Sequence, residues 1–105
     1  MSKSESEISR EIQDFLKAED FTYWRNQSGR VKVNGGYMHL GINGLSDLTV
    51  MLQDKHLYIE VKTLIGKQRE AQEGFEATCK ANGHYYLLAR SVTDVRRKLK
   101  ELGEV

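Results

Sequence analysis

Two short apolar segments joined by a polar turn constrain the fold of this chain more than any other feature. Residues 48–52 and 57–61 are rich in branched and aromatic side chains, which suit a pleated β-strand. The polar residues 53–55 between them predict a tight turn, so the two segments are expected to pair as a hairpin. Successive side chains of a strand point to opposite faces, which places the apolar and polar residues of the second segment on different sides.

Three charged residues gather at one end of this hairpin. Asp47 opens the first strand, while Glu60 and Lys62 end the second, on one face and roughly 7 Å apart at about 3.3 Å per residue. Folding back at the turn brings Asp47 towards Glu60. Two carboxylates make a hard-oxygen site for Mg²⁺ or Mn²⁺, and a neighbouring ammonium can orient a metal-bound water or stabilise negative charge. The alternative is a solvated strand face on which Glu60 and Lys62 are ordinary surface charges.

The hairpin residues carry a resemblance to a known family. Asp47, the apolar strand after it and Glu60-Val61-Lys62 resemble the Asp…(Asp/Glu)-x-Lys signature of the restriction-endonuclease-like, or PD-(D/E)xK, nuclease superfamily. The wider chain is similar to one branch, the virus-type replication-repair nuclease (VRR-NUC) domain. The matching pieces follow the expected order over nearly the whole chain: residues 6–8, 24–29, 44–48, 59–62, Gln72 with Phe75, and 89–91. Ser46 stands where the superfamily usually has proline.

This resemblance implies a fold, a cofactor and a set of site residues. The fold is α/β, a PD-(D/E)xK core in which a mixed β-sheet is flanked by α-helices, and residues 1–105 form one VRR-NUC nuclease domain. The cofactor is Mg²⁺ or Mn²⁺. The implied catalytic residues are Asp47, Glu60, Lys62, Gln72 and Glu7. The implied metal ligands are Asp47, Glu60, the Val61 backbone carbonyl and, through a water molecule, Glu7.

The first helix is expected from about Ser4 to Ala18, because apolar residues recur there at helical spacing. The resembling family has a metal-assisting Glu at the start of this helix, and counting back from Phe15 and Leu16 places Glu7 at that position. Glu11 is the alternative. A structural explanation for Glu7 also exists, since Ser4-x-x-Glu7 fits a capping box, in which Glu7 bonds the N-terminal backbone.

A strand is predicted over residues 21–25, followed by a hairpin of residues 30–33 and 37–40 that turns at Asn34-Gly35. Glycines and interspersed cations in this region suit contacts to a nucleic-acid backbone, although a plain hairpin explains them equally. The candidate DNA-binding residues, here and in the later segment 67–69, are Arg25, Asn26, Arg30, Lys32, Lys67 and Arg69.

The remaining chain predicts a helix, a strand and a helix. A second helix is expected from about Lys67 to Ala81 and stops at Asn82-Gly83. A strand is expected over residues 85–89, and Ser91 caps the last helix. The residues of the 67–81 helix that are expected to be buried are Ala71, Phe75, Thr78 and Cys79. Gln72 is either a solvated helix residue or, by resemblance, a group that reaches into the active site.

Length and composition set the remaining bounds. The chain has 105 residues, 39% hydrophobic and 30% charged, which fits one ordinary globular domain. No apolar run approaches the ~20 residues needed to cross a bilayer, so a membrane partner is not expected. The single cysteine, Cys79, agrees with a reducing cytoplasm, which would be that of a host cell if the chain is phage-encoded.

The site residues predict a metal-dependent DNA endonuclease, and the resemblance implies that it is structure-selective. A small domain has little surface for recognising branched DNA, so a symmetric homodimer is expected. Two opposed active sites would then cut a four-way (Holliday) junction as a junction resolvase does. Cleavage of flaps, other branched DNA or ends is the alternative activity. A DNA-binding module with a nuclease-like fold is the non-enzymatic alternative, and the intact Asp47, Glu60 and Lys62 argue against it.

Overall fold

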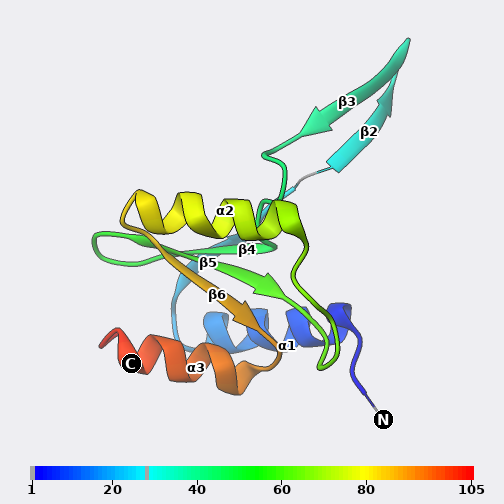
Figure 1. Cartoon of the computed structure of the whole chain (residues 1–105). Helices are drawn as coiled ribbons and strands as arrows, with labels where there is room; N and C mark the ends of the chain where they lie inside the picture. The colour runs from blue at the N-terminus through cyan, green and yellow to red at the C-terminus, as the bar shows by residue number, and fades with distance from the viewer. Residues whose placement is uncertain (1, 28) are drawn as a thin grey trace.

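The computed structural model describes residues 2–27 and 29–105. Within them the chain forms three helices and six strands (Figure 1). In order these are α1 (Glu5–Ala18), β1 (Thr22–Arg25), β2 (Gly29–Val33), β3 (Gly36–Leu40), β4 (Leu48–Met51), β5 (His56–Val61), α2 (Glu70–Ala81), β6 (Tyr85–Ala89) and α3 (Val92–Glu101).

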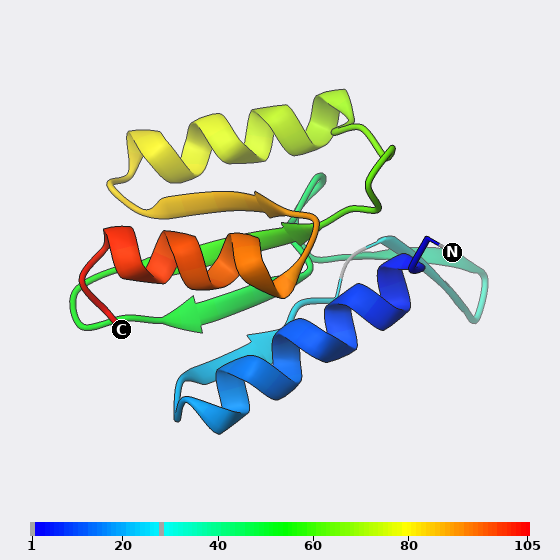
Figure 2. The ribbon, with the colours of Figure 1, turned by 90° about the horizontal axis from the view of Figure 1, so that it is seen from below.

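The main sheet has four strands in the order β1-β4-β5-β6. The β1–β4 and β4–β5 pairs are antiparallel, whereas β5 and β6 are parallel and connected through α2, as parallel neighbours require a crossover. Helix α2 covers one face of the sheet, and α1 and α3 lie side by side on the other (Figures 1 and 2). The predicted α/β architecture with a mixed sheet between helices is therefore confirmed.

Both faces of the sheet are packed. The larger core lies between the sheet and α1 with α3, and it includes Leu57, Ile59 and Val61 from one face of β5. The smaller core lies under α2 and is formed by Phe75, Cys79 and Tyr86. Because both faces of β5 are covered, the Glu60 side chain is buried as well as the apolar ones. No helix among the described residues has the length and apolar character that crossing a membrane requires.

The β2–β3 hairpin forms a separate two-stranded sheet that projects from the body of the molecule (Figure 1). It turns at the predicted Asn34-Gly35, where Gly35 adopts a φ of 86°. The Cα radius of gyration is 14.3 Å, compared with about 13 Å for a compact domain of this length. The protruding hairpin accounts for this difference.

Helix α2 differs from its prediction in two respects. It begins at Glu70 rather than Lys67, and its buried residues are Gln72, Phe75 and Cys79. The predicted buried residue Thr78 is exposed and donates a hydrogen bond to the Gly74 carbonyl, while Ala71 is half-buried. The helix therefore turns a polar residue, Gln72, towards the sheet, which is possible because its amide finds partners there.

Candidate functional site

Asn26 forms hydrogen bonds to residues before and after Asp47 and so fixes the segment that carries it. The Asn26 backbone N–H donates to the Asp47 carbonyl at 2.9 Å, and its side-chain Nδ2 donates to the Ser46 carbonyl at 3.1 Å and to Thr49 Oγ1 at 2.7 Å. Both N–H groups of the Asn26 amide are therefore engaged within the protein. These hydrogen bonds hold the segment that precedes β4, and the DNA contact of Asn26 stays a prediction.

A close backbone approach fixes the same segment against α2. Gly44 adopts a φ of 80°, and a Cβ at this position would lie 2.0 Å from the Ala71 carbonyl oxygen and 2.9 Å from the Gln72 backbone nitrogen. Only glycine allows this contact, because a side chain would collide with backbone atoms of the helix. Gly44 thereby sets the distance between the Asp47 segment and the helix that carries Gln72.

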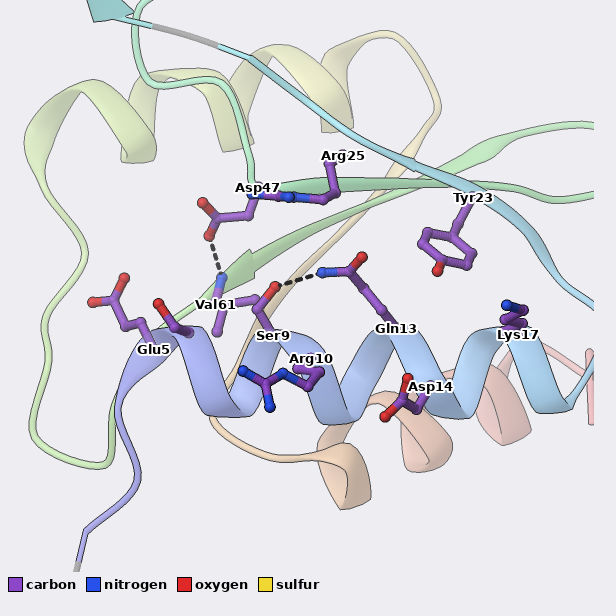
Figure 3. Close-up of a pocket in the computed structure, with 11 residues that line it drawn as sticks. Glu5, Ser9, Arg10, Gln13, Asp14, Lys17, Tyr23, Arg25, Asp47 and Val61 are labelled. Carbon is purple, nitrogen blue, oxygen red and sulfur yellow. Dashed lines mark hydrogen bonds between the residues drawn. The ribbon is translucent and has the colours of Figure 1, made fainter.

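Asp47 immediately precedes β4 and lies beside the C-terminal end of β5, as predicted. Leu48 pairs with Ile59, so one step further along the register Asp47 lies opposite Glu60. The Asp47 Oδ2 atom accepts a hydrogen bond of 2.7 Å from the Val61 backbone N–H (Figure 3). The hairpin thus brings the two carboxylates together at the point where its strands end.

Glu60 is 3% exposed, and its two oxygens differ in their partners. Its Oε2 atom accepts a hydrogen bond of 2.8 Å from Gln72 Nε2 and lies 3.9 Å from Lys62 Nζ. Its Oε1 atom is buried and has no hydrogen-bond partner among the described residues. Lys62 is itself buried, with 8% of its surface exposed. The structure therefore brings together four of the predicted site residues: Asp47, Glu60, Lys62 and Gln72.

The environment of Glu60 raises the pKa of its carboxyl group from 4.5 to about 8. Burial is the largest cause, followed by the negative charge of Asp47. The Lys62 ammonium acts in the opposite direction, and Glu5 adds a smaller upward contribution. Two carboxyl groups at such a site tend to retain one proton between them unless a cation is bound.

This raised pKa predicts how stability depends on pH. The unfolded chain loses the Glu60 proton near pH 4.5 and the folded chain near pH 8, so unfolding releases a proton between these values. The free energy of unfolding in EDTA should therefore fall as the pH rises through this window, with a slope approaching about 1.4 kcal/mol per pH unit. Urea titrations at half-unit pH intervals measure it.

The Glu60→Gln variant is the matched control, because it removes the titrating group and keeps the side-chain shape. Its free energy of unfolding should change less with pH than that of the wild type over the same window. Contributions from the histidines cancel in the comparison, since both proteins contain them. Equal slopes in the two proteins would contradict the assignment of a raised pKa to Glu60.

Helix α1 carries three glutamates, Glu5, Glu7 and Glu11, whose surroundings differ. Glu7 is exposed, and its Oε1 atom accepts hydrogen bonds from the Ser4 backbone N–H at 3.3 Å and the Ser4 hydroxyl at 3.2 Å, forming the capping box. Glu11 forms an ion pair with Lys3 at 2.8 Å. Glu5 is also exposed and lines the same cavity as Asp47 (Figure 3). The capping box proposed as the structural explanation for Glu7 is therefore present, and assistance to a metal by Glu7 stays a prediction.

A cleft of about 530 Å³ extends from Asp47 along α1 and β1 (Figure 3). Glu5, Asp47 and Val61 lie at one end, and Lys17 and Tyr23 at the other. The residues lining it also include two arginines, a third acid and several polar groups: Ser6, Ser9, Arg10, Gln13, Asp14 and Arg25. An elongated cleft of mixed charge leads from the carboxylate pair to cationic side chains.

The predicted DNA-binding residues are spread around this site. Arg25 is exposed and lies beside Asp47 in the cleft (Figure 3). Lys32 is exposed on the projecting hairpin, and Lys67 and Arg69 are exposed in the segment before α2. The Arg30 side chain lies outside the described part of the structure.

The acidic groups present fit a hydrated divalent cation. Among residues 2–27 and 29–105, no group of three or more His, Cys, Asp or Glu side chains is arranged to hold a metal ion. Mg²⁺, however, commonly uses one or two carboxylates and keeps several of its waters. The unpartnered Glu60 Oε1 is costly to bury as it stands, and a cation beside Asp47 would satisfy it.

Comparison of the sequence with models of known protein families finds no match, and comparison with curated proteins finds none either.

Proposed function

We propose that this chain is a metal-dependent endonuclease that hydrolyses phosphodiester bonds in branched DNA. The observation that carries the proposal is the buried Glu60 carboxylate, which has one unpartnered oxygen, an adjacent Asp47 carboxyl group and a buried Lys62 ammonium at 3.9 Å. Buried side-chain oxygens in folded proteins seldom lack a hydrogen-bond partner, so the unpartnered Glu60 Oε1 supports a bound cation. The same arrangement supports the resemblance to the PD-(D/E)xK and VRR-NUC nucleases.

Each residue has a defined role in this proposal. Asp47 and Glu60 would hold Mg²⁺ or Mn²⁺, and the Val61 carbonyl would be a further ligand. Lys62 positions the attacking water or stabilises negative charge at the phosphate. Gln72 fixes the orientation of Glu60 through its 2.8 Å hydrogen bond. When bound, the cation would polarise the phosphodiester and lower the pKa of a coordinated water.

The proposed substrate is a four-way DNA junction, cut by a homodimer. Each chain would supply one Asp47–Glu60 pair, so a two-fold dimer would present two sites to the two opposed strands of a junction. The cleft beside Asp47 is open and carries Arg10, Lys17 and Arg25, which suits a DNA backbone. Flaps, other branched DNA and ends are the alternative substrates, and a non-catalytic DNA-binding module is the alternative outside the enzymes.

The test is cleavage of labelled DNA. Linear, flap and four-way substrates are incubated with the protein in Mg²⁺, in Mn²⁺ and in EDTA. We expect cutting only when a divalent cation is present, and faster cutting of branched DNA than of linear DNA. Cutting that is equally fast in EDTA would overturn the proposal. Binding without any cutting would favour the DNA-binding module.

Metal binding should also stabilise the fold in the absence of DNA. A cation held only by the folded state raises the free energy of unfolding, by about 1.4 kcal/mol at ten times its dissociation constant. We expect about 10 mM Mg²⁺ or Mn²⁺ to raise the melting temperature by at least about 4 °C relative to EDTA. The Glu60→Gln variant should show a smaller rise, and an equal rise would place the cation elsewhere.

A further inference from the structure

The segment that follows Lys62 exposes two neighbouring apolar side chains. Leu64 is 69% exposed and Ile65 is 89% exposed, the two highest values among the large hydrophobic residues that the structure describes. Single exposed apolar residues are common on protein surfaces and need no explanation. Leu64 and Ile65, however, are adjacent, lie at the tip of a loop and follow a candidate catalytic lysine by two and three residues, so their exposure needs an explanation.

This tip is held in place by Arg90. Arg90 Nη1 donates to the Thr63 carbonyl at 2.5 Å and to the Gly66 carbonyl at 2.7 Å, and it lies 3.3 Å from the Leu64 carbonyl. The Gly66 N–H closes the turn by donating to Thr63 Oγ1 at 3.1 Å. Arg90 is itself anchored, because its backbone N–H donates to Asp94 Oδ2 at 2.8 Å. The backbone is thus fixed so that the two apolar side chains point outwards.

The surroundings of the tip indicate the kind of partner. It lies near the N-terminal end of α1, at the edge of the sheet where β5 ends (Figure 1). Leu64 lines a groove of about 250 Å³ with Ile8, Arg90 and the Lys3–Glu11 ion pair. The exposed cations Lys67 and Arg69 follow within five residues of Leu64. An apolar tip next to cations matches the two parts of DNA, its base stack and its phosphates.

The size of the tip argues against a protein partner. Stable protein–protein interfaces bury about 1,200 Å² or more, far beyond what two aliphatic side chains provide. Single aliphatic side chains are, however, enough to enter between stacked base pairs and kink a duplex. We propose that Leu64 and Ile65 form a wedge that inserts into the base stack at the branch point of DNA bound at the Asp47–Glu60 site. This inference rests on the proposed function, because it places the wedge on the substrate of that site.

Fluorescence of 2-aminopurine tests the insertion without any cleavage. A four-way junction carrying 2-aminopurine at the branch point is saturated with protein in EDTA. Wild-type protein should raise the emission at least about threefold, because unstacking relieves quenching, and a Leu64→Ser/Ile65→Ser variant should lose most of this rise. In Mg²⁺, the variant should cut the junction about tenfold more slowly and cut a single-stranded oligonucleotide at a rate within about twofold of the wild type.

Met51→Ser is the matched control, since Met51 is 48% exposed and lies at the opposite end of β4 from Asp47. It should give wild-type emission and wild-type cutting. Equal emission from wild-type and wedge variant, or no rise with the wild type, would overturn the wedge. The wedge would also be overturned if the variant without DNA had a different sedimentation mass from the wild type, because Leu64 and Ile65 would then form a contact between copies of the chain. A wild type that raises emission but cuts no DNA would refute the nuclease while supporting the wedge.

Discussion

Substituting Asp47 by Asn or Lys62 by Met should abolish DNA cutting while the protein stays folded and bound to DNA. Asp47 is one of two carboxylates at the site, and Lys62 is the only cation that the structure places within 4 Å of Glu60 among the described residues. Removing a group that acts on the reacting phosphate costs a factor on the order of 10³ or more in rate. Single-turnover cleavage of a four-way junction in Mg²⁺ measures this loss.

The β4–β5 hairpin supplies its own controls for these variants. Asp54 and Lys55 lie in the turn at its other end, so Asp54→Asn and Lys55→Met make the same chemical changes away from the site. Both should cut at rates within about threefold of the wild type, since neither position is near the carboxylate pair. Fluorescence anisotropy in EDTA should show similar DNA affinity for all four variants. A Lys62→Met protein that cuts as fast as Lys55→Met would disprove the proposed mechanism.

Substituting Gly44 by Ala should destabilise the protein severely. The new Cβ would collide with the Ala71 carbonyl oxygen, a backbone atom that cannot rotate away, and the backbone already has a φ of 80°. We expect a loss of at least about 3 kcal/mol in the free energy of unfolding, measured by urea titration. Cutting should fall with it, because the helix that carries Gln72 has to move.

The Gly83→Ala variant is the control that separates the two effects of Gly44→Ala, the collision with Ala71 and the strain of a side chain at positive φ. Gly83 has nearly the same φ, 78°, but nothing lies within 4 Å of a Cβ built there. The free energy of unfolding of the Gly83→Ala variant should therefore fall by only about 1 kcal/mol, the cost of placing a side chain in the left-handed region. Equal losses for Gly44→Ala and Gly83→Ala would show that the contact between the Asp47 segment and α2 is not as tight as the structure indicates.

The helices and strands were predictable because each follows a local rule. Alternation of apolar and polar residues identified β4 and β5, and Asn34-Gly35 identified the turn of the projecting hairpin. The meeting of Asp47 with Glu60 followed from the same reasoning, since a short hairpin leaves little choice of register. The burial of Glu60 and Lys62 did not follow, because it depends on α2 covering that face of the sheet.

The position of Glu5 beside the cleft has a signal in the sequence. Glu5 lies three residues before Ile8 and seven before Ile12, which is the spacing of the buried stripe itself. Glu7 lies off that stripe and is used by Ser4 to cap the helix. Continuing the apolar stripe towards the N-terminus would have selected Glu5, whereas matching to a family position selected its neighbour. The roles of Asn26 and Arg90 as donors to distant carbonyl groups had no local signal.

Gln72 belongs to the helix and to the site at the same time. Its Oε1 atom accepts from the Arg69 backbone N–H at 2.8 Å, which closes the first turn of α2, while its Nε2 atom donates to Glu60. Replacement by glutamate would retain the first interaction but place a third negative charge beside the carboxylate pair, and replacement by an aliphatic residue would lose both. Evolution therefore cannot adjust the beginning of this helix independently of the charge balance around Glu60, and selection on either property constrains the other.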